Sequence, residues 1–199
     1  RRIPAAHRAV LRGEWRRINW GAPRMFSRMR LGLVGYGRLG RRVANIAEAM
    51  GLTVNYYDPY VIGGAKDILE LASSSDILSL HATSTEETRD LISETVLKRL
   101  PKGAMVINTA RGELLDTDTL VDLLETGHIF AAALDTIDRE YEVDFEATLE
   151  KSRLLEYARS HDNLILTPHI GGSTLDAWKE TQRQVLKKAA MTLGLKLPV

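Results

Sequence analysis

The chain has no cysteine, so neither a disulfide nor a thiolate can take part in its structure or chemistry. It contains no run of about 18 apolar residues, the length that a transmembrane helix requires, and no pattern typical of a signal peptide. The histidines are scattered without the spacing of a metal site: His7, His81, His128, His161 and His169. We therefore expect a cytoplasmic protein with no metal and no membrane contact.

Acidic residues are scarce in the first part of the chain. Residues 1–42 carry 12 arginines and one acid, Glu14, so their net charge is +11, whereas the remainder carries −10 and the whole chain +1. A basic segment of this kind can bind nucleic acid. No aromatic-rich RNA-binding platform accompanies these arginines, so we expect contact with an acidic surface of the same molecule or of a partner instead.

The hydrophobic fraction of 44% and the charged fraction of 27% are typical of a soluble globular protein. Short, nearly all-apolar runs read as buried strands over residues 31–35, 52–58, 76–81, 104–110, 130–136 and 163–169. Helical spacing separates them over residues 38–50, 65–72, 93–100 and 116–125, and a long helix follows Thr174. This alternation predicts an α/β fold, a doubly wound, Rossmann-like parallel sheet with helices on both faces.

Two segments fall outside this rhythm. Residues 5–17 read as a helix after Pro4, and residues 138–162 read as an acidic, partly helical insertion. The chain starts at Arg1 rather than at methionine, so we expect a fragment or a processed or shortened form.

The stretch "GYGRLG" places Gly35, Gly37 and Gly40 in the G-x-G-x-x-G spacing, after a predicted strand and at the start of a predicted helix. This context is typical of a dinucleotide-binding loop, in which backbone N–H groups at a helix N-terminus face a pyrophosphate. Asp58 ends the next strand, 18 residues after Gly40, where an acid can accept both ribose hydroxyls and repel a 2′-phosphate. The pattern favours NAD over NADP, although nearby basic residues could compensate.

Three further residues follow later strands: Arg111 and His169 at predicted strand ends, and Glu140 in the loop after the fifth strand. A guanidinium fork suits a carboxylate, an imidazole can move a proton, and a carboxylate can hold the second imidazole nitrogen. Singly, each has a structural alternative: a carbonyl cap, one more acid in an acidic loop, or a satisfied loop histidine. Together with a nicotinamide they predict hydride transfer at a 2-hydroxy or 2-keto acid.

The sequence resembles the D-isomer-specific 2-hydroxyacid dehydrogenase family over most of residues 3–137 and 161–193. The matching stretches are "IPAAHRAVLRGEW", "LGLVGYGRLG", "DILSLHATSTEETRDLI", "LPKGAMVINTARGELLDTDTLVDLLETGHIFAAALD" and "NLILTPHIGGST". The resemblance implies that Arg111 binds substrate, that His169 is the acid/base and that Glu140 is its partner. It implies NAD contacts by Gly35, Tyr36, Gly37, Arg38, Leu39, Gly40, Asp58, His81, Ala82, Thr83, Thr109, Ala110, Asp135, Gly171 and Gly172. His81 itself we expect to be structural.

The resemblance also divides the chain into a connecting helix and linker over residues 1–25, a Rossmann NAD-binding domain over 26–175, and a C-terminal helix over 176–199. That helix would return toward a substrate domain which these residues do not include, so we expect the chain alone to bind NAD but to be inactive. The chain departs from the family at Tyr141, where a proline is usual, and in the longer, more acidic stretch that follows.

Several functional alternatives stay open. The segment "TPHIGGST" is similar to that of D-3-phosphoglycerate dehydrogenases, with glyoxylate or hydroxypyruvate reductase and D-lactate dehydrogenase as rivals. Relatives with this fold also act as NAD-sensing co-repressors that bind peptides without turnover. The family resemblance further implies a homodimer, and a small anionic 2-hydroxy or 2-keto acid as the substrate.

Overall fold

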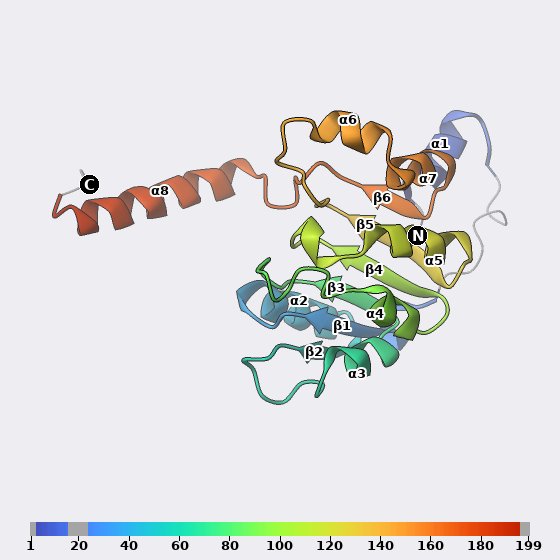
Figure 1. Ribbon diagram of the computed structural model, residues 1–199, viewed down its shortest axis with the longest axis horizontal. Coiled ribbons are helices and arrows are strands. Elements are labelled where there is room, and N and C mark those ends of the chain that lie inside the picture. The colour runs from blue at the N-terminus through green and yellow to red at the C-terminus, as the bar shows by residue number, and fades with distance from the viewer. Residues whose placement is uncertain (1–2, 16–23, 196–199) are drawn as a thin grey trace. The chain divides into compact units, whose positions relative to one another are not determined.

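Six parallel strands form one sheet in the order β2-β1-β3-β4-β5-β6, which Figure 1 shows from bottom to top. This computed structural model describes residues 3–15 and 24–195. The chain divides into two units, residues 1–167 and residues 168–199, and each is described by itself. The sheet lies in the first unit and confirms the predicted doubly wound α/β fold.

The strands and helices follow the predicted alternation. The strands are β1 (Arg30–Val34), β2 (Thr53–Tyr57), β3 (Ile77–Leu80), β4 (Ala104–Asn108), β5 (Ile129–Leu134) and β6 (Leu164–Leu166). The helices are α1 (Ile3–Leu11), α2 (Arg38–Ala49), α3 (Ile68–Ser73), α4 (Glu94–Arg99), α5 (Thr117–Glu125), α6 (Phe145–Glu150), α7 (Arg153–Ser160) and α8 (Leu175–Thr192). The 3-10 turns Phe26–Arg28 and Gly112–Leu114 precede β1 and follow β4.

Two apolar clusters cover the two faces of the sheet. The larger cluster packs side chains of α3, α4, α5 and α7 against one face, with Leu78, Val106 and Leu134 fully buried. The smaller cluster packs α2 against the other face of β1 through Ala44, Ala47 and Leu33. The two clusters bury the central strands on both sides, as the nearly all-apolar strand sequences predict.

The predicted boundaries need correction at several ends. The helix expected over residues 5–17 begins at Ile3 and ends at Leu11, because Gly13 (φ 81°) turns the chain, while residues 16 and 17 lie outside the described residues. The strand expected over residues 104–110 already ends at Asn108. The insertion of residues 138–162 is partly helical as expected, since it contains α6 and α7.

The second unit contains α8, whose first turn is capped by Thr174, because Thr174 Oγ1 accepts a hydrogen bond from the Ala177 backbone N–H at 3.2 Å. Among the described residues, none of the helices combines the length and apolarity needed to cross a membrane. The same residues include no cluster of three or more histidine or acidic side chains able to hold a metal ion.

Asp76 ties the start of β3 to the start of β1. Its buried carboxylate, 7% exposed, accepts hydrogen bonds from the Arg30 backbone N–H at 2.9 Å and Arg30 Nε at 3.0 Å, and from Arg24 Nη1 at 2.9 Å. The hydrogen bond from the Arg30 side chain, reinforced by Arg24 and opposed by burial, holds the pKa of Asp76 well below its usual range.

We expect Asp76→Asn to remove part of the acid sensitivity of folding. Because the folded-state pKa of Asp76 lies below the unfolded value of about 3.9, its stabilisation is present above about pH 4 and is lost as the pH falls further. The variant should lose about 1–3 kcal/mol of stability at pH 7 and show a flatter decline of Tm below pH 4. Thermal melts from pH 3 to 7 check this, with Glu48→Gln at an exposed position of α2 as the control. Parallel acid profiles for Asp76→Asn and the parent would contradict it.

Candidate functional site

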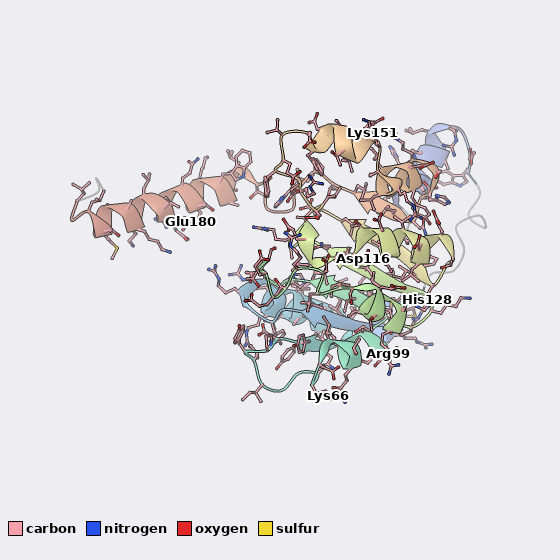
Figure 2. All side chains as sticks on the ribbon, in the orientation of Figure 1. Lys66, Arg99, Asp116, His128, Lys151 and Glu180 are labelled. Atoms are coloured by element: carbon pink, nitrogen blue, oxygen red, sulfur yellow. The ribbon has the colours of Figure 1, made fainter. Side chains whose placement is uncertain are left out.

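Residues that follow β1, β2, β3, β4 and β5 meet at one edge of the sheet, because all of these strands run parallel. Val34 pairs in register with Tyr57 and Leu80, and Leu80 pairs with Asn108. Figure 2 shows Arg99 and His128 on the right of the view, at the opposite edge, where β4 and β5 begin. The predicted site residues of the first unit therefore lie at the carboxyl edge, where open α/β sheets bind ligands.

The glycine loop is built by close backbone contacts. Gly35 has φ 92°, and a Cβ on it would lie 2.7 Å from the Ala82 backbone nitrogen. A Cβ on Gly40 would lie 2.3 Å from the Gly35 carbonyl oxygen, so this glycine permits α2 to start against the loop. A Cβ on Gly37 would meet nothing within 4 Å, which leaves open space at the residue where a pyrophosphate would approach the backbone.

Asp58 joins the glycine loop to the end of β2. Its Oδ2 accepts a hydrogen bond from the Tyr36 backbone N–H at 2.7 Å, and its Oδ1 accepts one from the Tyr60 backbone N–H at 2.9 Å. A carboxylate oxygen has two acceptor positions, so each oxygen can still accept a ribose hydroxyl. The open space at Gly37 and this oriented carboxylate together fit a dinucleotide.

Aromatic stacking holds Tyr36, the residue between the first two glycines of the loop. The rings of Tyr36 and Tyr56 stack with centroids 3.7 Å apart, and the guanidinium carbon of Arg41 lies 4.6 Å from the Tyr36 centroid. The Tyr56 hydroxyl donates a hydrogen bond to the Ile62 carbonyl at 2.8 Å. Tyr36 is thus fixed from β2 and α2, while the expected NAD contacts Arg38 and Leu39 lie exposed at the start of α2.

His81 makes two polar contacts at this edge. Its Nε2 lies 3.0 Å from Ser79 Oγ, and its backbone N–H donates to the Val34 carbonyl at 2.7 Å. Burial lowers the pKa of His81, so the ring is uncharged at neutral pH. Beside it, the half-buried Ala82 and exposed Thr83 continue the loop, and the Thr88 hydroxyl donates to the Thr83 carbonyl at 2.8 Å.

Arg111 follows β4 and is exposed. Its Nη1 donates a hydrogen bond to the Ala110 carbonyl at 2.6 Å, and no carboxylate among the described residues forms an ion pair with it. Thr109, before it, is also exposed, whereas Ala110 is buried. An exposed guanidinium at this edge without an acidic partner is suited to an anionic ligand.

Glu140 and Asp135 lie on the segment after β5. Asp135 is buried, accepts a hydrogen bond from the Thr167 hydroxyl, and its backbone N–H donates to the Asn108 carbonyl at 2.8 Å. Glu140 lies in a turn whose preceding residue, Arg139, has φ 63°. A Cβ on Gly112 would lie 2.0 Å from the Asp138 backbone nitrogen, so the segment after Arg111 packs directly against the segment before Glu140.

The histidine and the last two glycines of the predicted site belong to the second unit. His169 has φ 51°, an unusual backbone conformation for a residue other than glycine, and Gly171 and Gly172 follow it before α8. The first unit brings Arg111 and the Glu140 segment together. The approach of His169 to them stays a prediction.

Sequence analysis did not assign roles to three residues that organise the edge: Tyr56, Asn108 and Thr167. The one available signal was at Asn108, a polar residue inside the apolar run "AMVINTA". The stacking partner of Tyr56 and the hydrogen-bond partner of Thr167 are Tyr36 and Asp135, which lie 20 and 32 residues away, so no local pattern could reveal these two contacts.

Comparison with known proteins gives concordant matches. Residues 1–171 match the family model described as D-isomer specific 2-hydroxyacid dehydrogenase, NAD binding domain. The chain is 35% identical to D-3-phosphoglycerate dehydrogenase of Haemophilus influenzae over 94% of its residues and 46% of that protein. It is 31% identical to hydroxypyruvate reductase of Thermotoga maritima over 98% of its residues and 62% of that protein.

A solved structure of a D-lactate dehydrogenase is similar to this chain as well. D-lactate dehydrogenase from Aquifex aeolicus, complexed with NAD and lactic acid, superposes with a TM-score of 0.83 at 28% identity, over 97% of this chain and 62% of that one. The chain spans less than half the length of the D-3-phosphoglycerate dehydrogenases that it matches first.

Alanine substitutions at two glycines should separate loop construction from ligand binding. Gly40→Ala should lower Tm and abolish NAD binding, because its Cβ meets the Gly35 carbonyl oxygen. Gly37→Ala has room for its Cβ, so it should leave Tm within a few degrees of the parent and weaken NAD binding about tenfold or more by obstructing the pyrophosphate. Thermal melts and calorimetric titration measure both; an unaltered NAD affinity in Gly37→Ala would count against the assigned phosphate position.

Proposed function

This chain belongs to the D-isomer specific 2-hydroxyacid dehydrogenase family as its NAD-binding domain, and we propose that the protein containing it interconverts a D-2-hydroxy acid and its 2-keto acid. The nicotinamide of bound NAD supplies the hydride chemistry. The observation that carries the proposal is the exposed Arg111 guanidinium, which has no acidic partner among the described residues and lies at the sheet edge that also carries the glycine loop and Asp58.

Arg111 binds the substrate carboxylate in this proposal. A guanidinium offers two parallel N–H donors to a carboxylate, and its permanent charge polarises the adjacent carbonyl. Its present hydrogen bond to the Ala110 carbonyl uses Nη1 alone and leaves the other donors for the ligand. The charge also explains why the substrate should be anionic.

His169 moves the proton, and Glu140 orients it. During reduction the imidazolium would protonate the oxygen that develops negative charge at C2, and during oxidation the neutral imidazole would take that proton back. A carboxylate at the second ring nitrogen favours the protonated ring. Glu140 is on a segment held against the Arg111 segment through Gly112, which supports a shared role for the two residues.

D-3-phosphoglycerate is the leading substrate candidate, because several similar relatives carry the name D-3-phosphoglycerate dehydrogenase. A hydroxypyruvate reductase and a D-lactate dehydrogenase are also similar, so unphosphorylated C2 and C3 acids belong in the same test. We propose the cytoplasm as its compartment, which fits a cysteine-free chain and which cell fractionation would check.

We also propose a homodimer. The first 42 residues carry +11 and the rest −10, a complementarity that two copies can use. Phe130 in β5 and Ile165 in β6 are 54% and 43% exposed, which adds apolar surface suited to an interface. Light scattering at micromolar concentration should give twice the mass of one copy; the mass of a single copy would contradict the dimer.

A substrate screen of the full-length protein with NADH tests the function. We expect turnover of at least one acid among 3-phosphohydroxypyruvate, hydroxypyruvate, glyoxylate and pyruvate. His169→Gln should lower kcat about 10²- to 10⁴-fold by removing the proton donor. Arg111→Ala should act mainly by raising KM for the keto acid.

Arg99→Ala is the matched control, because Arg99 is an exposed arginine at the opposite edge of the sheet and should leave both constants unchanged. Absence of turnover with every acid, or an Arg111→Ala variant as active as Arg99→Ala, would refute the proposed function.

A further inference from the structure

Asn108 is a fully buried polar residue at the last position of β4, in the middle of the sheet. It is 0% exposed and pairs in register with Leu80 on one side and Leu134 on the other. Burying an amide in such surroundings is costly unless its donor and acceptor are both satisfied. An apolar side chain would fit the strand pattern better, so the amide needs an explanation.

Both the donor and the acceptor of the Asn108 side-chain amide form hydrogen bonds with the backbone of the turn that follows β4. Oδ1 accepts a hydrogen bond from the Ala110 backbone N–H at 3.0 Å, and Nδ2 donates one to the Arg111 carbonyl at 2.8 Å. The Ala110 N–H belongs to the peptide unit before Ala110 and the Arg111 carbonyl to the one after Arg111, so the two bonds restrain the Ala110–Arg111 peptide unit from both sides. The Ala110 carbonyl belongs to that peptide unit, and it is the acceptor for the Arg111 guanidinium.

The other side of Arg111 is fixed by close packing. Gly112 lies against Ile137 and Asp138 so closely that no side chain fits there. Arg111 is therefore held between a hydrogen-bonded turn before it and a tight backbone contact after it. Its exposed guanidinium extends from a backbone that has little freedom.

We propose that Asn108 is a positioning residue that sets the direction of the Arg111 guanidinium toward the substrate carboxylate. This role rests on the proposed function of Arg111. It requires a side chain with one donor and one acceptor at fixed separation, which asparagine provides. Ionised aspartate accepts but cannot donate, serine is shorter, and leucine does neither.

The test substitutes Asn108→Asp in the full-length protein and measures KM for the keto acid and for NADH separately. Ionised aspartate would lose the donor and place negative charge against the Arg111 carbonyl. We expect KM for the keto acid to rise about 10- to 100-fold, because a displaced Arg111 guanidinium no longer aligns with the substrate carboxylate. KM for NADH should stay within about twofold of the parent.

A pH series gives a readout that a general loss of stability would not produce. A protonated aspartate carries an O–H that can donate to the Arg111 carbonyl as the amide does. The ratio of the KM of Asn108→Asp to that of the parent, measured at each pH, should therefore fall toward one as the pH is lowered. A ratio that stays constant with pH, or a keto-acid KM equal to the parent's, would overturn the proposal.

Ser75→Ala is the matched control. Ser75 is 1% exposed, donates a hydrogen bond to the Leu71 carbonyl at 2.6 Å and lies before β3, at the opposite edge of the sheet. Its loss should lower Tm without changing the KM for the keto acid. An equal rise in KM for Ser75→Ala would show that the effect of Asn108 is merely structural.

Hydrogen exchange in the parent protein keeps the proposal testable if Asn108→Asp does not fold. The Ala110 amide should exchange slowly, because Asn108 Oδ1 holds it, and exchange at the rate of an open turn would overturn the role. The experiments distinguish failure of the proposed function from failure of the role of Asn108. A parent protein that turns over none of the acids refutes the proposed function. An active parent whose Asn108→Asp variant has an unchanged KM for the keto acid refutes the role of Asn108 alone.

Discussion

Parallel pairing of β1 with β3, and of β3 with β4, brings the residues after each strand to the same edge of the sheet. Gly35 then touches the backbone of His81 and Ala82, and the turn after Asn108 lies one strand further along. A slip of one residue in either pairing would reverse the two faces of a strand and separate these contacts. The buried apolar clusters on both faces hold the register, so core packing determines the geometry of the site.

At this edge, hydrogen bonds made by polar side chains replace the apolar packing of the strands. Asp58 binds the N–H of Tyr36 and of Tyr60, Asn108 binds the N–H of Ala110, and Asp135 accepts from the Thr167 hydroxyl. Each of these side chains lies at or just after the end of a strand and holds a residue in its own loop or in the loop after a neighbouring strand. Loops that are fixed in this way can present exposed groups such as Arg111 without themselves being part of the core.

Much of this arrangement could be predicted from the sequence. Apolar runs predicted the six strands. The glycine spacing and Asp58 predicted a dinucleotide-binding loop and an acid after β2, and the structure joins these two segments by a hydrogen bond. The end of β4 at Asn108 was missed although its signal is local, because an asparagine side chain can accept a hydrogen bond from the backbone N–H two residues on. Local patterns could not show the contact of Gly112 with Ile137 and Asp138, since it joins segments distant in sequence. The convergence of His169 with Arg111 rests on the family resemblance and stays a prediction.

The most direct test of NAD binding at the glycine loop and Asp58 is calorimetric titration of the chain with NAD and, separately, with NADP. The two cofactors differ only in the 2′-phosphate that would face Asp58. NAD should bind at least about tenfold more tightly, because the 2′-phosphate of NADP would bring a like charge to the half-buried Asp58 carboxylate. Equal or tighter binding of NADP, or no binding of either cofactor, would contradict it.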